Sequence, residues 1–421
     1  MIIDTEKWQE IFKTLGQHKL RSALTAFGVF WGIFMLTVLL GAGKGLENGV
    51  MQGFPRVPNI IWVWTQGATQ LPYQGMPVGR HIQLNPEDVA AIEKNVPSVG
   101  FIRGQNSVGI WSGSPPYTVY KDKNGTFFAE GMHAGMDNIN SLRILEGRSF
   151  NDFDDKEKRK VVIIGTRVRT QLFDTHEDPI GADITINGIS FKVIGIFESL
   201  ANGNQQQEEE KMYIPNDTLR YAFNQVGWIG SFVIQPKPGL HARVAEEDVK
   251  KYLAELKKVS PDDQGVFGSF NLQNEFDKIN GLFTGITVFS WLVAIGTIMA
   301  GAIGVGNIML IVVKERTREI GLRKALGATP TSIVGMIVQE SIFITAVAGY
   351  SGLVMGVLLL EFINGVMESS GANAGFFRHP EVDFATAISA LVVLVISGLL
   401  ASLMPAAKAA SVNPIVALQD E

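Results

Sequence analysis

Four long segments without charged side chains constrain the fold of this 421-residue chain more than any other feature. No Asp, Glu, Lys or Arg occurs within residues 22–43, 279–313, 341–360 and 384–407. Each segment is at least as long as the roughly 20 residues that a helix needs to cross about 30 Å of hydrocarbon. The sequence therefore predicts an α-helical membrane protein with four transmembrane helices.

The distribution of basic residues predicts which loops face the cytoplasm. Residues 1–21 contain four Lys and Arg residues and residues 314–324 contain five, whereas residues 361–383 contain only Arg378 against four acidic residues. Cytoplasmic loops carry the excess of Lys and Arg. We therefore expect the N-terminus, the segment 314–340 and the tail 408–421 to be cytoplasmic. Residues 44–278 and the short loop 361–383 would then lie outside.

The large external segment 44–278 is predicted to be an α+β domain inserted between the first and second spans. Residues 60–64, 161–164 and 191–197 are rich in β-branched and aromatic residues, which is typical of strands. A helix is expected to begin at Asn85-Pro86, and a second helix is indicated by an apolar stripe of Val249, Tyr252, Leu253 and Leu256. The polar run 202–210 is predicted to be a mobile loop.

The second charge-free segment is longer than a membrane requires. Its 35 residues would extend about 50 Å as a helix, at about 1.5 Å per residue. We therefore expect one helix to run from the external domain through the membrane to Lys314. Two G-x-x-x-G spacings, at Gly28–Gly32 and Gly352–Gly356, would allow close helix contacts, although this spacing is common by chance in glycine-rich spans.

Residues 1–21 are predicted to form a cytoplasmic amphipathic helix. Trp8, Ile11, Phe12 and Leu15 recur at helical spacing and would form one apolar face. That face suits a helix lying in the headgroup layer of the membrane, or a helix packed on a protein partner.

The residues needed for catalysis, nucleotide binding or ion coupling are not recognisable. The run Gly41-Ala-Gly-Lys-Gly45 lacks the first Gly and the Ser/Thr of a phosphate-binding loop, so we interpret it as a flexible exit from the first span. His176-Glu177-Asp178 is interpreted as a solvated turn, and the chain has no cysteine. Ion-coupled transporters place ionisable residues within their spans, whereas the four predicted spans of this chain contain no Asp, Glu, Lys or Arg. We therefore predict no catalytic residue, metal site or cofactor on this chain, and no nucleic-acid partner.

The short charged segment after the second span is predicted to contact another protein. The eleven residues 314–324 carry five basic and two acidic side chains, too few residues for a domain. Glu340 lies near the same side of the membrane and either pairs with these basic residues or takes part in signalling. The candidate site residues are Lys314, Glu315, Arg316, Arg318, Glu319, Arg323, Lys324 and Glu340.

Several motifs resemble one family over nearly the whole chain. Residues 307–328 resemble the cytoplasmic loop of MacB-type permeases of the ABC superfamily, which are related to FtsX and to the lipoprotein-releasing LolC and LolE. The other motifs that carry this resemblance are residues 19–25, 146–150, 161–165, 179–182, 191–196 and 404–418.

The resemblance implies a fold and a mechanism. The periplasmic domain would have a porter-like part and an inserted β-rich part at about residues 125–225, and the permease would act as a homodimer or with a similar chain. A separate cytoplasmic ATPase dimer would bind ATP and Mg and move the cytoplasmic loops, and the long helices would transmit this motion outward. The protein would lie in the inner membrane and drive export, together with a periplasmic adaptor and an outer-membrane channel. The alternatives are an FtsX-like regulator of a cell-wall hydrolase and a LolC/LolE-like subunit that releases lipoproteins.

Overall fold

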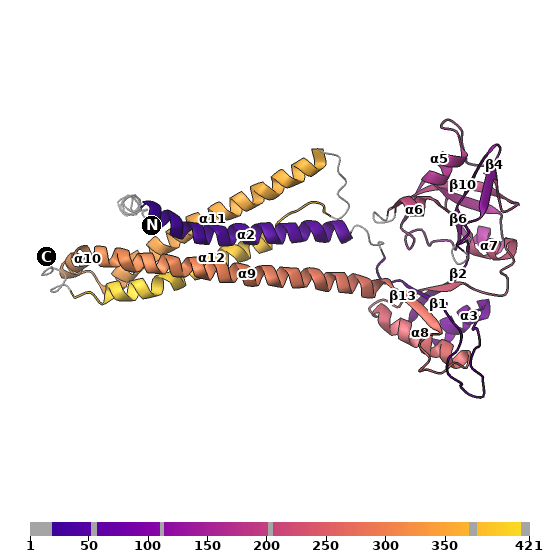
Figure 1. Cartoon of the computed structure of the whole chain (residues 1–421), viewed down its shortest axis with the longest axis horizontal. Helices are drawn as coiled ribbons and strands as arrows, with labels where there is room; N and C mark the ends of the chain where they lie inside the picture. The colour runs from indigo at the N-terminus through magenta and orange to yellow at the C-terminus, as the bar shows by residue number, and fades with distance from the viewer. Residues whose placement is uncertain (1–18, 52–56, 110–112, 201–204, 370–376, 414–421) are drawn as a thin grey trace. The chain divides into compact units, whose positions relative to one another are not determined.

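The computed structural model describes residues 19–51, 57–109, 113–200, 205–369 and 377–413 (Figure 1). The chain divides into a membrane unit, residues 1–50 with 282–421, and an external unit, residues 51–281. Each unit is described by itself. The predicted amphipathic helix lies almost entirely outside the described residues.

Four long apolar helices make up the membrane unit, which confirms the four predicted spans. These are α2 (Lys19–Met51), α9 (Leu272–Glu315), α11 (Pro330–Ser369) and α12 (Phe384–Ala410). Helix α2 continues to Met51, so the expectation of a flexible exit at residues 41–45 is wrong. The two outer glycines of that run lie against other parts of the unit: a Cβ on Gly41 would meet Leu360, and a Cβ on Gly45 would meet the Phe377 ring.

Glycines allow the helices of the membrane unit to approach closely. A Cβ added at Gly28 of α2 would lie 3.2 Å from the Cα atom of Gly301 in α9. A Cβ added at Gly352 of α11 would lie 2.5 Å from the carbonyl oxygen of Phe30 in α2. Both G-x-x-x-G spacings therefore lie at helix contacts, where small residues let backbones come together.

Helix α9 is continuous over 44 residues, as the sequence predicts. At about 1.5 Å per residue it is about 66 Å long, about twice the thickness of the hydrocarbon core. A short helix, α10 (Thr317–Ala325), follows it after Arg316. Helix α11 already begins at Pro330, so residues 330–340 are helical and do not form a loop. Pro330 occupies the first helical position, where its missing N–H is not needed.

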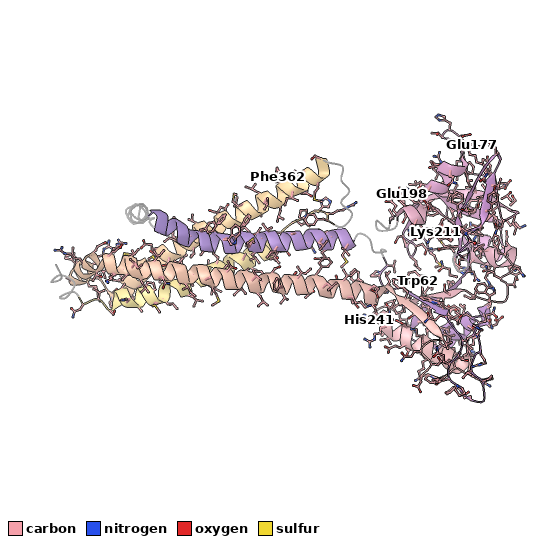
Figure 2. All side chains as sticks on the ribbon, in the orientation of Figure 1. Trp62, Glu177, Glu198, Lys211, His241 and Phe362 are labelled. Atoms are coloured by element: carbon pink, nitrogen blue, oxygen red, sulfur yellow. The ribbon has the colours of Figure 1, made fainter. Side chains whose placement is uncertain are left out.

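A four-stranded antiparallel sheet forms the first part of the external unit, in the order β13-β1-β12-β2. Its strands are β1 (Ile61–Thr65), β2 (Val99–Gln105), β12 (Ser231–Pro236) and β13 (Phe267–Asn271). Helices α3 (Pro86–Asn95) and α8 (Ala242–Leu256) cover one face, where Val63, Phe232 and Val249 share one core. The predicted stripe on α8 is correct at Val249 and Leu253, whereas Leu256 is 44% exposed. Trp62, labelled in Figure 2, lies on the opposite face because side chains alternate along a strand.

A larger mixed sheet forms the inserted β-rich part. Its order is β3-β6-β11-β8-β10-β9-β4-β5, with β7 paired to β10. The strands are β3 (Ser107–Val108), β4 (Tyr117–Tyr120), β5 (Lys123–Thr126), β6 (Phe128–Met132), β7 (Leu142–Gly147), β8 (Val161–Gly165), β9 (Asp183–Ile186), β10 (Ile189–Ser199) and β11 (Lys211–Pro215). The accompanying helices are α4 (Asp152–Lys156), α5 (Thr166–Leu172), α6 (Gln205–Glu209) and α7 (Asn216–Ala222).

Two sequence expectations need correction here. The β-rich part begins at Ser107 rather than at about residue 125, because β3 pairs with β6 directly after β2 ends. Residues 205–209 form helix α6 instead of a mobile loop. Lys211 ties this helix to the sheet, since it forms ion pairs with Glu208 of α6 at 2.7 Å and with Glu130 of β6 at 2.9 Å.

The two sheets share a core, which makes the external unit one compact body. Ile60 and Val233 of the first part are buried in the same cluster as Met132, Ile163 and Tyr213 of the β-rich part. Burial also raises the pKa of Tyr213 well above its ordinary value, with nearby Glu130 and Glu208 adding to the effect.

Candidate functional site

The predicted charged segment forms a helical elbow, which we define as Lys314–Leu326. Helix α9 ends at Glu315, Arg316 adopts φ −94° and ψ 12°, and α10 begins at Thr317. Ile320 is 1% exposed and belongs to the core of the membrane unit. Burial of Ile320 fixes which face of α10 points inward, and the remaining side chains are therefore sorted into an inward set and an outward set.

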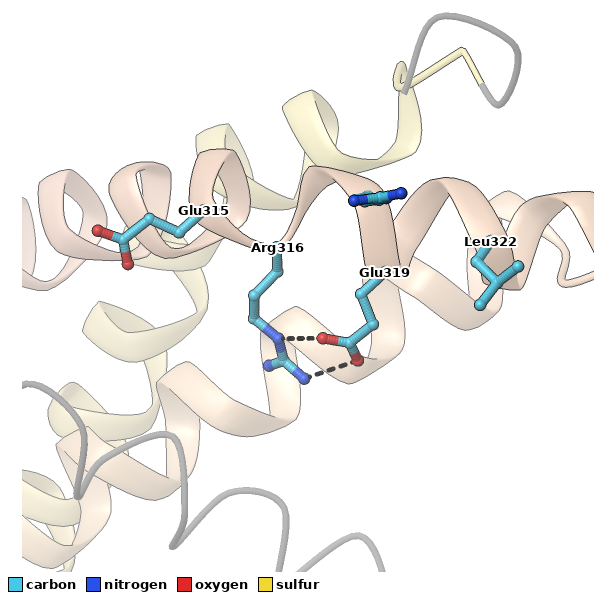
Figure 3. Close-up of a pocket in the computed structure, with 5 residues that line it drawn as sticks. Glu315, Arg316, Glu319 and Leu322 are labelled. Carbon is cyan, nitrogen blue, oxygen red and sulfur yellow. Dashed lines mark hydrogen bonds and ion pairs between the residues drawn. The ribbon is translucent and has the colours of Figure 1, made fainter. Parts of the chain in front are cut away.

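Arg316 belongs to the inward set. Its guanidinium donates two hydrogen bonds to Glu319, at 2.8 and 3.0 Å (Figure 3). The Nη1 atom also lies 3.6 Å from Oε2 of Glu340 in α11. Glu340 is only 3% exposed, so this carboxylate needs a cationic partner to remain charged. Of the two interpretations of Glu340, the structure therefore supports pairing with a basic residue of the elbow.

Arg323 and Lys324 tie the elbow to two other helices. Arg323 forms an ion pair with Glu319 at 2.8 Å and contacts the thioether of Met336 in α11. The Lys324 ammonium donates to the carbonyl oxygens of Ala410 and Val412, both at 2.7 Å. These carbonyls lie at the C-terminal end of α12, where backbone acceptors lack helical partners and a cation is favourable.

Lys314, Glu315 and Arg318 form the outward set and are exposed. Glu315 and Arg318 line an open depression of about 580 Å³, together with Arg316, Glu319 and Leu322 (Figure 3). Among the residues that the structure describes, no ion pair is found for the side chains of Lys314 and Arg318. These two cations are available to an acidic partner.

Two leucines of this surface were missed by the sequence analysis. Leu322 is 51% exposed and Leu326 is 81% exposed, although both are large apolar residues. Arg318, Leu322 and Leu326 follow one another at intervals of four, which places them along one side of a helix. That spacing was visible in the sequence, but their exposure was not. We call Lys314, Arg318, Leu322 and Leu326 the elbow surface.

In the parts of the chain that the structure describes, no three His, Asp or Glu side chains are grouped as metal ligands. The exposed turn at Glu177 is held by its own neighbours, because Tyr120 donates a 2.7 Å hydrogen bond to Glu177 and Lys121 pairs with it. Hydrogen bonds from Lys121 and Tyr120 lower the pKa of Glu177.

The fold and the elbow define a multi-pass membrane protein with a large α+β domain between its first and second spans. Residues 22–252 match the family model of the MacB-like periplasmic core domain, and residues 291–414 match the FtsX-like permease C-terminal model. The chain therefore belongs to the family of MacB-like ABC transporter permeases.

Several curated relatives are similar over nearly the whole chain. The macrolide export ATP-binding/permease protein MacB of Bdellovibrio bacteriovorus is 26% identical over 97% of this chain and 61% of its own length. The pyoverdine export ATP-binding/permease protein PvdT of Pseudomonas savastanoi is 28% identical over 98% of this chain and 59% of its own length. The chain thus spans about three fifths of these two relatives. The uncharacterized ABC transporter permease YknZ of Bacillus subtilis is 27% identical, with 96% of both chains covered.

Among solved structures, the periplasmic region of MacB from Actinobacillus actinomycetemcomitans is 22% identical, with a TM-score of 0.42. The match covers 56% of this chain and 98% of the chain in that structure.

Proposed function

We propose that this chain is the permease subunit of an ABC export complex and that it transmits the motion of a separate cytoplasmic ATPase to its external unit. The observation that carries this proposal is the two-sided elbow. Its inward side chains are bonded to α11 and α12, whereas the elbow surface is exposed at the end of the continuous helix α9.

The chemistry of the elbow surface suits a protein partner. Fully burying a leucine side chain contributes about 1.5–3 kcal/mol, so Leu322 and Leu326 would supply most of the affinity. The charges of Lys314 and Arg318 would select an acidic rim and fix the register of docking. A partner with an apolar groove bordered by carboxylates fits this surface.

The inward ties determine how a force on the elbow would spread. Arg316 and Glu340 connect the elbow to α11, and Lys324 connects it to α12. A displacement of α10 would therefore move these helices together with α9. The segments 22–43, 279–313, 341–360 and 384–407 contain no Asp, Glu, Lys or Arg, which favours a mechanical role over an ion pathway.

The relatives supply the remaining elements of the proposal. Two of them are named as export proteins with an ATP-binding part, and YknZ, which matches this chain in length, is named as a permease. By analogy, ATP and Mg would bind to the partner ATPase. The permease would pair with a second copy or with a similar chain in the inner membrane, with both termini in the cytoplasm. A periplasmic adaptor and an outer-membrane channel would complete the export route.

Purification from native membranes tests the docking step. We expect an ATPase to co-purify with the wild-type chain and to be lost from an Arg318→Glu/Leu326→Glu variant, because both anchoring interactions are removed. Lys408→Glu is the matched control, since Lys408 is also exposed, in the last turn of α12. Retention of the ATPase by the double variant would contradict docking through the elbow surface.

A further inference from the structure

Helix α9 begins without a linker at the edge of the four-stranded sheet. Strand β13 ends at Asn271, and α9 starts at Leu272. The Asn271 side-chain oxygen accepts a 3.2 Å hydrogen bond from the N–H of Asn274, and the N–H of Leu272 donates to the carbonyl of Ile60 at 3.0 Å. The first turn of α9 is therefore held at both of these backbone N–H groups, by the last residue of β13 and by the residue that precedes β1.

The same first turns of α9 also bond to the N-terminus of α8. The side-chain oxygen of Gln273 accepts a 2.7 Å hydrogen bond from the N–H of Ala242, the first residue of α8. His241, labelled in Figure 2, precedes Ala242 and lies 2.8 Å from Asp277 through its Nε2 atom. Its Nδ1 atom accepts a hydrogen bond from the N–H of Arg243, so Nε2 carries the hydrogen and donates to the Asp277 carboxylate.

Glu246 of α8 adds a third connection. One of its oxygens accepts a 2.7 Å hydrogen bond from Asn271, and the other accepts from Ser269 of β13 and from Lys250 at 3.0 Å. Burial by itself raises the pKa of Glu246, but the hydrogen bonds from Ser269, Asn271 and Lys250 outweigh it and lower that pKa. The carboxylate is thus charged at neutral pH and holds α8 to β13, whose last residue, Asn271, directly precedes α9.

These contacts form a joint between two helix N-termini, which we call the α8–α9 joint: His241, Glu246, Asn271, Gln273 and Asp277. The first N–H groups of a helix have no partner within the helix, and negative charge is favourable beside them. Here Gln273 of α9 supplies an acceptor for the first N–H group of α8, and Asp277 of α9 supplies the negative charge near it. The inner stripe of α8, including Ala245, Val249 and Leu253, is fully buried in the core of the four-stranded sheet. Helix α8 therefore cannot shift without disturbing this core.

We propose that Gln273 and Asp277 are positioning residues that pass the movement of α9 to α8, so that α8 and its sheet are the first part of the external unit to respond. This inference rests on the proposed function, because it takes α9 to be the moving element. It adds the point at which motion enters the external unit and the side chains that carry it.

Amide hydrogen exchange on the full complex tests this inference. The chain is purified with its ATPase in lipid nanodiscs and compared without nucleotide and with ATP trapped by a hydrolysis-blocked ATPase. In the wild type we expect ATP to change exchange both in α9 and in residues 242–249 of α8. In a Gln273→Ala/Asp277→Ala variant we expect the change in α8 to be lost while the change in α9 remains.

Controls separate this effect from damage to the fold. Glu275→Gln/Lys278→Gln removes an exposed 2.7 Å ion pair on the same turns of α9 and should leave the response of α8 intact. The single variant Asp277→Asn, with Gln273 unchanged, keeps an acceptor for His241. It should therefore show the wild-type response of α8. Exchange in the buried strand β8 should be the same in all variants.

The outcomes distinguish the two proposals. If the α8 response persists in the Gln273→Ala/Asp277→Ala variant, the joint does not carry the motion, although the proposed function stands. If ATP changes exchange in neither α9 nor α8 of the wild type, the proposed function fails and this inference fails with it.

Discussion

Replacing Gly301 with alanine tests the contact that holds α9 against α2. The added methyl group would lie 2.8 Å from the nitrogen of Val29 and 2.9 Å from the carbonyl carbon of Gly28. Both are backbone atoms, so the clash is relieved only if the helices move apart. Overpacking typically costs about 1–3 kcal/mol, whereas Gly→Ala in a helix interior gains about 1 kcal/mol from propensity.

We therefore expect Gly301→Ala to lower the free energy of unfolding by up to about 2 kcal/mol. Gly296→Ala is the matched control on the same helix, because no atom lies within 4 Å of a Cβ at that position. It should be neutral or up to about 1 kcal/mol more stable. Unfolding in mixed micelles with increasing SDS, followed by circular dichroism, measures both variants. Equal stability of the two variants would refute the assignment of Gly301 to a close helix contact.

Two further predictions concern buried carboxylates. Glu340→Gln should lower the free energy of unfolding of the membrane unit by about 1–2 kcal/mol in the same SDS titration. This loss is smaller than for a fully buried pair, because Arg316 still forms its ion pair with Glu319. An unchanged free energy of unfolding would contradict the pairing of Arg316 with Glu340. Asp154→Asn tests the external unit: burial by itself raises the pKa of this carboxyl, but the hydrogen bond from Arg148 and other contacts outweigh it and lower the pKa. A lowered folded pKa stabilises the fold above the ordinary carboxyl value of about 4, and this stabilisation is lost as pH falls through the folded pKa. Asp154→Asn should therefore destabilise the chain at pH 7 and progressively less below about pH 4 in denaturant titrations, and a pH-independent difference would contradict this.

The spans and the central strands could be predicted because their signals are local. Residues 279–313 lack charge over a length that only a long helix accommodates, and residues 161–164 are β-branched throughout. The helical course of residues 41–45 was missed because it depends on tertiary contacts. Three glycines in five residues favour a flexible segment in isolation, but Leu360 and Phe377 pack against two of them.

The division of the candidate site into inward and outward residues could not be predicted from sequence. All eight candidate residues are charged, and charge alone does not show which side chains face the other helices. Arg316 meets Glu340 only because α10 folds back beside the start of α11, and Lys324 reaches Ala410 only because α12 ends there. The exposure of Leu326 likewise follows from the burial of Ile320 on the other side of α10.

Whether ATP on the cytoplasmic side changes the external unit is the central question. The most direct measurement is amide hydrogen exchange of α9 residues 272–281 in the purified complex, with and without trapped ATP. The account predicts a change in exchange in wild type that is abolished by Lys314→Glu/Arg318→Glu, and that is retained by Lys408→Glu. Unchanged exchange in residues 272–281 while the ATPase binds and hydrolyses ATP would contradict it.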